Sequence, residues 1–508
     1  MTHSRPLNPH IKLVRLASDE AFDTLLIELK QWRKDNGKRG WGKLEPAVLR
    51  VVKLITLDLL TAWLSSPELL VGYSRNAAEF LKGGRYWDDK SGQKLFTETV
   101  FLSVVDGLAA LNYLLDKRAK QGTSGESSRI KATQMLIDVM KGNGINWAAI
   151  DASPEPSEVI ELKSKKDKFD RQIKLVFKDT DYIRIPEMRE TVLRINDELK
   201  GTLVNLKVTD KQLKDINVRL ANDERRQMVD FTYRYIVREF TNESFEVGGR
   251  FYKGWWQDIP REYRKFIQIQ GKPTAELDYS TLHPTILYLK EGLLPPTDSY
   301  DFDGWDNEHR SIYKKTFNQI LNSKSKMHKK TMWGNFAPDL LDNNSAPGWK
   351  HLNKHQQGKL NREEFLRLMG RSYEDLIDSI LVKHQPIQHH FFTQAWSWLQ
   401  RLDSDIAEKV MLKMLDEEDI PILPLHDSFI VRAIFKGVLS KVMEVSFKDV
   451  IKGDPTIDAK PSLLDGVGKF YTLRDYSFDD YVEDQETSSG YHQRNAEWKQ
   501  VWGLSGWD

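Results

Sequence analysis

Two aspartates, Asp278 and Asp427, each end an apolar, β-rich run, AELD and ILPLHD. A carboxylate in such a place is costly unless it is hydrogen-bonded or holds a cation. If the two runs pair as neighbouring strands, their carboxylates could hold two Mg²⁺ ions about 3.5–4 Å apart, with Mn²⁺ as a substitute. One ion would activate an attacking 3′-hydroxyl and the other would stabilise a leaving pyrophosphate. The alternative is that each aspartate belongs to an ordinary turn.

Between these aspartates, residues 307–322 predict a helix with Asp306 as its N-cap. Polar side chains recur there at every fourth position and form one slowly winding stripe. Its cations could bind a triphosphate, and its amides could reach a sugar and a base. The alternative is an ordinary exposed helix face. The stripe consists of Arg310, Lys314, Asn318 and Asn322.

In this order and spacing, the motifs resemble the polymerase superfamily that joins family A DNA polymerases to single-subunit RNA polymerases of the phage and mitochondrial type. The run LDYS, which ends at Ser280, resembles motif A of that superfamily. The pair His426–Asp427 resembles the His-Asp turn of motif C, and the stripe resembles the fingers helix. The resemblance covers residues 245–450, about 40% of the chain.

The resemblance implies that Asp278, Asp427 and the backbone carbonyl of Tyr279 bind the metal ions. It also implies that Arg310 and Lys314 bind the incoming triphosphate.

Two shorter matches concern the primer and template. QRLDSDIAEK, which contains Gln400 and Asp403, is similar to a helix that reads the primer–template minor groove in family A DNA polymerases. EVGGRFY resembles a Gly-Arg element of the single-subunit RNA polymerases, and this resemblance implies that Arg250 contacts nucleic acid. With His426, these residues are expected to position primer and template.

Two departures from the family pattern leave the sugar open. Asn322 stands where the fingers helix usually has Tyr, and His283 stands where DNA polymerases have Glu and RNA polymerases have a small residue. The bulky imidazole favours deoxynucleotides, although it could also donate to a 2′-hydroxyl. The hypothesis is therefore a template-directed DNA polymerase. The alternatives are a DNA-directed RNA polymerase or primase-like enzyme, and a template-independent transferase or a catalytically inactive nucleic-acid-binding relic.

The expected fold class is α+β, a right-hand polymerase with palm, fingers and thumb behind a mostly helical N-terminal domain. The helical domain is expected at 1–150, and a helical, thumb-like, template-binding region at 151–245. A palm is expected at 246–477, with a fingers insertion at about 298–375. A flexible tail is expected at 478–508.

Local patterns predict the elements that position the aspartates. A hairpin around Gly271 would deliver Asp278, and a helix with Pro284 in its first turn would follow. A strand, a tight turn and a second strand are expected around His426, after a long helix at 386–418. Periodic, charged residues predict another long helix at 211–240.

Composition limits the partners. The 508 residues carry 75 Lys and Arg against 74 Asp and Glu, so any surface for a nucleic-acid template, a primer or nucleoside triphosphates must be local. The absence of cysteine excludes disulfides and thiol catalysis. No apolar run of about 18 residues and no signal-peptide core are present, so we expect a cytoplasmic protein that does not enter a membrane.

Overall fold

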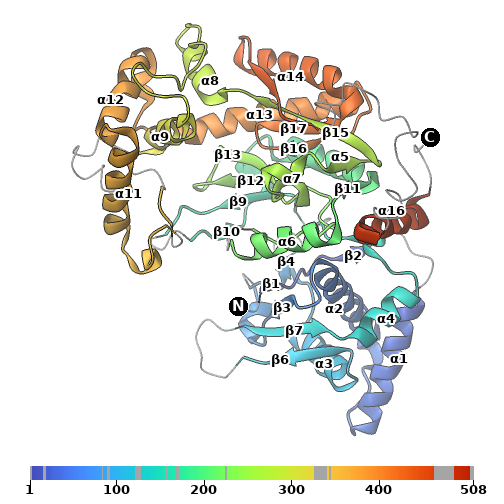
Figure 1. The fold of residues 1–508 in the computed structure, drawn as a ribbon. Coiled ribbons are helices and arrows are strands. Elements are labelled where there is room, and N and C mark those ends of the chain that lie inside the picture. The colour runs from blue at the N-terminus through green and yellow to red at the C-terminus, as the bar shows by residue number, and fades with distance from the viewer. Residues whose placement is uncertain are drawn as a thin grey trace.

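The chain forms a mixed α/β structure with several small sheets, as a computed structural model shows (Figure 1). The N-terminal part, in blue, lies at the bottom of this view, and helices α9, α11 and α12 lie at its left edge. The structure describes residues 3–14, 19–82, 84–88, 92–119, 127–154, 158–167, 171–223, 226–324, 340–342, 345–462 and 486–503.

The N-terminal part contains helices that pack against a four-stranded sheet of order β1-β3-β7-β6. The prediction of a helical domain at 1–150 is right about the long helices and wrong about the sheet, which it did not include. The elements are β1 (Ser4–Pro6), β2 (Lys12–Leu13), α1 (Glu20–Asp35), α2 (Glu45–Ser65), β3 (Leu70–Tyr73), β4 (Trp87–Asp88), β5 (Gln93–Lys94), α3 (Glu98–Ala110), β6 (Leu114–Lys117), β7 (Ser128–Ala132), α4 (Gln134–Gly142) and β8 (Ile150–Asp151).

A cap at the end of α3 explains how a strand arises inside an apparently helical run. Asn112 has φ 62°, a left-handed conformation that Asn tolerates. The Tyr113 amide donates to the Leu108 carbonyl at 2.9 Å, and the Asn112 amide donates to Ala109 at 3.1 Å. These two bonds form a Schellman cap, so the helix stops and the following residues extend into β6.

A second four-stranded sheet, of order β10-β9-β12-β13, follows in the chain with two helices beside it. The predicted helix at 211–240 is wrong beyond Ala221, because the described residues 226–236 are turn and irregular backbone and the chain then enters strand β12. That strand pairs with β9 on one side and β13 on the other, and its sequence VREFT contains residue types that suit a strand. The elements are β9 (Ile160–Lys163), β10 (Lys174–Leu175), α5 (Ile185–Gly201), β11 (Val204–Leu206), α6 (Asp210–Ala221), β12 (Val237–Thr241) and β13 (Ser244–Tyr252).

The central sheet has the order β11-β14-β15-β17-β16, and β18 pairs with the end of β15. Both predicted hairpins are confirmed. Gln270 and Gly271, at φ 52° and 68°, form the two-residue loop between β14 and β15. Residues 426–427 form the loop between β16 and β17. The strands are β14 (Ile267–Ile269), β15 (Lys272–Tyr279), β16 (Leu423–Leu425), β17 (Ser428–Arg432) and β18 (Ile457–Ala459).

Most of the helices of the second half lie between β15 and β16 or after β17 in the chain, and α14 packs against β15 and β17. The predicted helix at 386–418 is interrupted, because Phe392 and Gln394 adopt φ 62° and 59°. Their amides donate to the carbonyls of Ile320 and Ser323 at the end of α9, each at 3.0 Å, instead of continuing a helix. The helices are α7 (Arg261–Arg264), α8 (Leu282–Lys290), α9 (Arg310–Asn322), α11 (Lys354–Met369), α12 (Tyr373–Lys383), the 3₁₀ turn η7 (Gln385–His390), α13 (Trp396–Asp416) and α14 (Lys436–Ile451).

Buried apolar residues show how these parts combine. One cluster of described residues lies within 7–150, and a larger one extends from Val159 to Phe447. The expected boundary at 245 falls inside the larger cluster and within strand β13, which pairs with β12, so 151–245 is not a separate unit. No helix among the described residues is long and apolar enough to cross a membrane.

The expected flexible tail is wrong for its described part, since helix α16 (Ser489–Trp502) packs against the body of the protein. Trp498 is buried against Trp147, with ring centroids 5.6 Å apart. The guanidinium of the buried Arg234 lies 5.0 Å from the Trp147 ring and 4.9 Å from the Trp498 ring. The two rings contact each other and this cation, and these contacts hold the helix against the body of the protein.

We predict that Trp498→Ala loosens α16, because it opens a cavity beside Arg234 that costs about 3–5 kcal/mol. Hydrogen exchange of the α16 backbone amides in the full chain measures this loss as faster exchange. Gln500→Ala, on the exposed side of the same helix, is the control and should exchange like the wild type. Unchanged exchange in Trp498→Ala would contradict the packing argument.

Candidate active site

Asp278 and Asp427 lie together at the end of the β15–β17 ladder. The register places Asp278 opposite Ser428, the residue after Asp427. The Tyr279 amide donates to the Asp427 carbonyl at 3.1 Å, which joins the two positions directly. The two aspartates are therefore neighbours in the structure, Asp278 on β15 and Asp427 in the β16–β17 loop, and their role as metal ligands stays a prediction.

A third carboxylate enters from β18. Asp458 is the antiparallel partner of Asp278, and directly opposed residues of a ladder share one face. Like charges in that arrangement repel each other. The Nζ of Lys460, two residues further along, forms an ion pair with Asp278 Oδ2 and compensates part of the repulsion. The cluster of Asp278, Asp427, Asp458 and Lys460 is called the carboxylate cluster below.

Asp278 is an unusual carboxyl group. Burial raises its pKa, and the charges of Asp427 and Asp458 raise it further, while the hydrogen bond from Lys460 lowers it and offsets only part of the rise. Its Oδ1 is buried and has no hydrogen-bond partner among the described residues. A buried oxygen with this surplus of negative charge near it suits a hard cation, which prefers oxygen ligands.

His426 adopts φ 68° in the hairpin loop, a conformation that is uncommon for a residue with a side chain. Its ring lies against Tyr252, with centroids 5.1 Å apart and an edge-to-face angle of 63°. Burial, reinforced by the nearby charge of Arg250, lowers the pKa of His426 to about 4. The imidazole is therefore neutral at physiological pH, beside the carboxylate cluster.

A second polar group joins three of the predicted residues. Asp403, which is 2% exposed, accepts hydrogen bonds from Arg250 Nε at 3.2 and 3.1 Å, and it pairs with Arg250 Nη2. It also lies 3.1 Å from His283 Nε2. Burial raises the pKa of Asp403, but the hydrogen bond from His283 and the charge of Arg250 outweigh that effect and hold the pKa below its usual value. The carboxylate is therefore ionised and fixes the two side chains around it.

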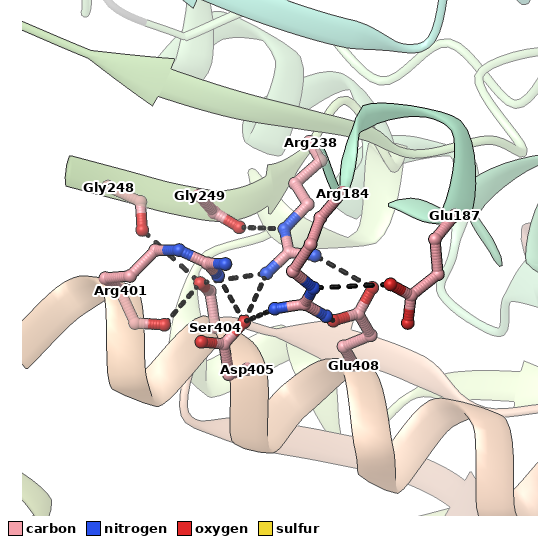
Figure 2. Close-up of polar contacts among 9 residues, drawn as sticks. All are labelled: Arg184, Glu187, Arg238, Gly248, Gly249, Arg401, Ser404, Asp405 and Glu408. Atoms are coloured by element: carbon pink, nitrogen blue, oxygen red, sulfur yellow. Dashed lines mark hydrogen bonds and ion pairs between the residues drawn. The ribbon is translucent and has the colours of Figure 1, made fainter. Parts of the chain in front are cut away.

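A larger charge network holds α13, and so Asp403, against the sheet of β12 and β13 (Figure 2). The guanidinium of the fully buried Arg238 donates from Nε to the Gly249 carbonyl at 3.0 Å. It also lies 2.9 Å from Asp405 Oδ1 and 2.8 Å from Glu408 Oε1, both on α13. Further ion pairs join these two carboxylates to Arg184, and Arg401 pairs with Asp405.

The structure explains why the Gly-Arg element contains two glycines, Gly248 and Gly249. Both have positive φ, 81° and 84°. A Cβ on Gly249 would lie 2.9 Å from Ser404 Oγ and 2.9 Å from Phe240 Cε1. Since Ser404 Oγ also donates to the Gly248 carbonyl at 3.3 Å, the glycines let β13 approach α13 closely enough for Arg250 to reach Asp403.

The predicted helix at 307–322 begins at Arg310, and its N-cap position is His309 rather than Asp306. Asp306 still accepts from the His309 amide at 3.1 Å and so stabilises the preceding turn. Arg310 donates to Asp298 at 2.8 and 2.9 Å, and its guanidinium lies 5.1 Å from the Tyr300 ring. Asp298 raises the pKa of Arg310, and the charge of Asp458 adds to this effect. Arg310, at the start of α9, therefore lies within electrostatic reach of the carboxylate cluster.

The loop that contains Asp298, the partner of Arg310, is held in place by His384. This buried imidazole lies 2.8 Å from the Ser299 carbonyl through Nε2 and 3.1 Å from the Tyr288 hydroxyl through Nδ1. Burial lowers the pKa of His384 to about 4, so the neutral ring donates to the carbonyl and accepts from the hydroxyl.

The remaining predicted residues are less closely tied to the cluster. Lys314 is exposed, with Nζ 6.0 Å from the Tyr300 ring centroid, and Asn318 and Asn322 follow it on α9. Gln400 is half-buried one turn before Asp403. The Tyr279 side chain points away from the cluster, since its hydroxyl donates to the Met443 carbonyl at 2.6 Å. Its backbone carbonyl role stays a prediction.

A pocket of about 370 Å³ borders the cluster, because Lys460 and Glu276 line it, and Glu276 precedes Asp278 by two residues on the same strand face. Its other charged lining comes mainly from α7. This pocket offers cations for a phosphate-bearing chain next to the carboxylates. Those cations are Arg261, Arg264, Lys265 and Lys460.

Sequence reasoning missed Asp458 and Lys460. The signal was present as alternation in IDAK, residues 457–460, which places the aspartate and the lysine on one face of a strand. Only the pairing of β18 with β15 shows that this face adjoins Asp278.

No protein-family model matches the chain, and the curated proteins contain no match to it.

We predict that Gly249→Ala destabilises the protein by about 1–3 kcal/mol, because alanine is strained at φ 84° and its methyl group would press against Ser404. Thermal unfolding measures the loss. Gly437→Ala in α14, where a Cβ meets nothing within 4 Å, is the matched control and should be neutral. Equal melting temperatures for the two variants would show that the close approach is not required.

Proposed function

We propose that the chain is a template-directed nucleotide polymerase that joins nucleotides by two-metal-ion phosphoryl transfer. The observation that supports this most is that Asp278, near the end of β15, adjoins Asp427 in the β16–β17 loop, with the buried Asp278 Oδ1 left without a partner among the described residues. The motif order described above for residues 245–450 supports the same assignment.

The residues of the cluster fit a pair of Mg²⁺ ions, which Asp278 and Asp427 would hold. Bound there, the ions would lower the pKa of an attacking 3′-hydroxyl and neutralise the leaving pyrophosphate. Lys460 compensates the negative charge of Asp278 in the structure, so its ammonium must move or share that carboxylate when cations bind. Asp458, opposite Asp278, adds negative potential to the same place.

Nucleotide binding falls to α9 in this proposal. Asp298 and the Tyr300 ring hold the Arg310 guanidinium in one orientation, which reduces the entropy lost when it binds phosphate. Lys314, one turn further on, is exposed, and its ammonium lies 6.0 Å from the same Tyr300 ring. A guanidinium held in place and an exposed ammonium one turn later suit the β- and γ-phosphates of a triphosphate.

The group around Asp403 would position the primer and template. Burial lowers the pKa of Arg250, but the charge and hydrogen bonds of Asp403, with a smaller effect of Asp427, raise it above its usual value, so the guanidinium keeps its charge within electrostatic reach of the cluster. His283 is held by Asp403 through Nε2, so its ring is a fixed obstacle at the start of α8. A fixed ring favours deoxynucleotides over ribonucleotides, because it cannot move aside for a 2′-hydroxyl.

The test is primer extension on a defined DNA template, with dNTPs or NTPs, with and without primer, and with and without Mg²⁺. We expect Mg²⁺-dependent, template-dependent extension with dNTPs. Extension with NTPs alone would favour an RNA polymerase, and extension without template would favour a terminal transferase. Nucleic-acid binding without any Mg²⁺-dependent product would overturn the polymerase proposal.

Asp427→Asn should reduce extension by at least about 10³-fold, because the metal ions supply several kcal/mol of transition-state stabilisation. The substitution keeps the side-chain size and removes one charge, so folding should be preserved. Asp419→Asn, in the exposed turn before β16, is the control and should extend normally. Normal extension by Asp427→Asn would exclude this carboxylate from the reaction.

Arg310→Ala should raise KM for the incoming nucleotide by about 10–100-fold, because a hydrogen bond to a charged phosphate contributes about 1.5–3 kcal/mol. Steady-state kinetics at saturating primer–template measures the change. Lys315→Ala removes an exposed cation from the same helix but outside the stripe, and it should leave KM within about twofold. Equal increases in both variants would point to general electrostatic attraction instead of a specific contact.

A further inference from the structure

Two neighbouring histidines and a glutamate meet on the surface where α8 ends. Glu291 is the C-cap residue of α8, and His389 and His390 are the last residues of η7. They are far apart in the sequence, but α8 and η7 are in contact. Neither the carboxylate cluster nor the group around Asp403 includes these residues.

Their donor atoms converge on one point. Glu291 Oε1 lies 3.1 Å from His389 Nε2 and 2.8 Å from His390 Nε2. The two imidazole centroids are 4.1 Å apart, so the rings lie side by side instead of diverging. One ligand atom from each residue falls within 4.8 Å of the others, and this is the one such group of three or more His, Asp or Glu among the described residues.

This spacing suits a first-row transition metal ion. Ligand atoms about 2.0–2.1 Å from a tetrahedral Zn²⁺ are about 3.3 Å from one another, so the three atoms need to move little to surround an ion. Two imidazole nitrogens and one carboxylate oxygen are ligands that Zn²⁺, Co²⁺ and Ni²⁺ accept, whereas Mg²⁺ prefers oxygen alone.

The surroundings hold part of the site in place. The His390 side chain is only 14% exposed, and its ring lies 5.8 Å from Trp398, edge to face. The Lys290 ammonium lies over the same Trp398 ring at 4.9 Å. His389, 56% exposed, leaves one side of the group open to solvent and to an arriving ion.

We propose that Glu291, His389 and His390 form a binding site for a Zn²⁺-class divalent ion. Three protein ligands leave a fourth position for water, so the ion is exchangeable rather than enclosed. The ion joins the end of α8 to the turn that leads into α13. Because His283 at the start of α8 already contacts Asp403 on α13, the metal adds a second link, between the end of α8 and the segment that precedes α13. This proposal does not depend on the polymerase assignment.

The test is a calorimetric Zn²⁺ titration of the full chain in excess Mg²⁺, which occupies carboxylate sites that accept hard ions. We expect one strong Zn²⁺ equivalent and a melting temperature that rises with Zn²⁺ concentration. His390→Ala and Glu291→Ala should each weaken that binding by at least about 100-fold, because even partners behind the ligands contribute 10–100-fold. The Glu291 side chain is 30% exposed and that of His390 only 14%, so circular dichroism checks that both variants fold.

His309→Ala is the matched control. His309 also pairs with a carboxylate at the surface, with Nδ1 2.8 Å from Asp306, but no second imidazole of the described residues forms a metal-binding group with it. The control should keep wild-type Zn²⁺ binding. The proposal is overturned if the wild type binds no Zn²⁺ equivalent, if His390→Ala and Glu291→Ala bind as the wild type does, or if His309→Ala loses binding to the same extent.

Discussion

The buried guanidinium of Arg238 is the constraint on which the arrangement of this protein depends most. A charge with no exposure to solvent is tolerated only when opposite charges and hydrogen-bond acceptors surround it. Its compensation comes from two carboxylates of α13 and a carbonyl of β13 (Figure 2). Because these partners lie on two different elements, the pairing fixes both the distance and the rotation of α13 relative to the sheet.

That fixed rotation has consequences near the carboxylate cluster. Asp403 lies on the same helix, two residues before Asp405, and it reaches Arg250 and His283 only if α13 keeps this orientation. Gly249 permits the approach from the other side, since any side chain there would collide with Ser404. The buried network therefore preorganises residues that do not belong to it.

The central sheet contains unfavourable electrostatic interactions at one strand end. Opposed carboxylates at Asp278 and Asp458 repel each other, and burial further disfavours the charge on Asp278. Lys460 relieves this only in part. Cations that bind at this strand end would relieve the repulsion and so stabilise the sheet. The paired strands hold the carboxylate oxygens in place before the cations bind.

Local sequence determined the elements that carry the two aspartates. Gln270–Gly271 and His426–Asp427 read as tight hairpin loops, and Pro284 marked the first turn of α8, because turn chemistry and proline act through the backbone of a few residues. The order of motifs along the chain also predicted that Asp278 and Asp427 would meet. Helix ends and strands such as β6 and β12 were misjudged, since Asn112 and sheet pairing override the local periodicity there. Only the tertiary structure brought Asp458 and Lys460 to Asp278, joined Arg250 and His283 through Asp403, and gathered Glu291 with His389 and His390. Those contacts depend on which elements pack together, and packing is decided by the burial of the whole core and not by any one segment of the sequence.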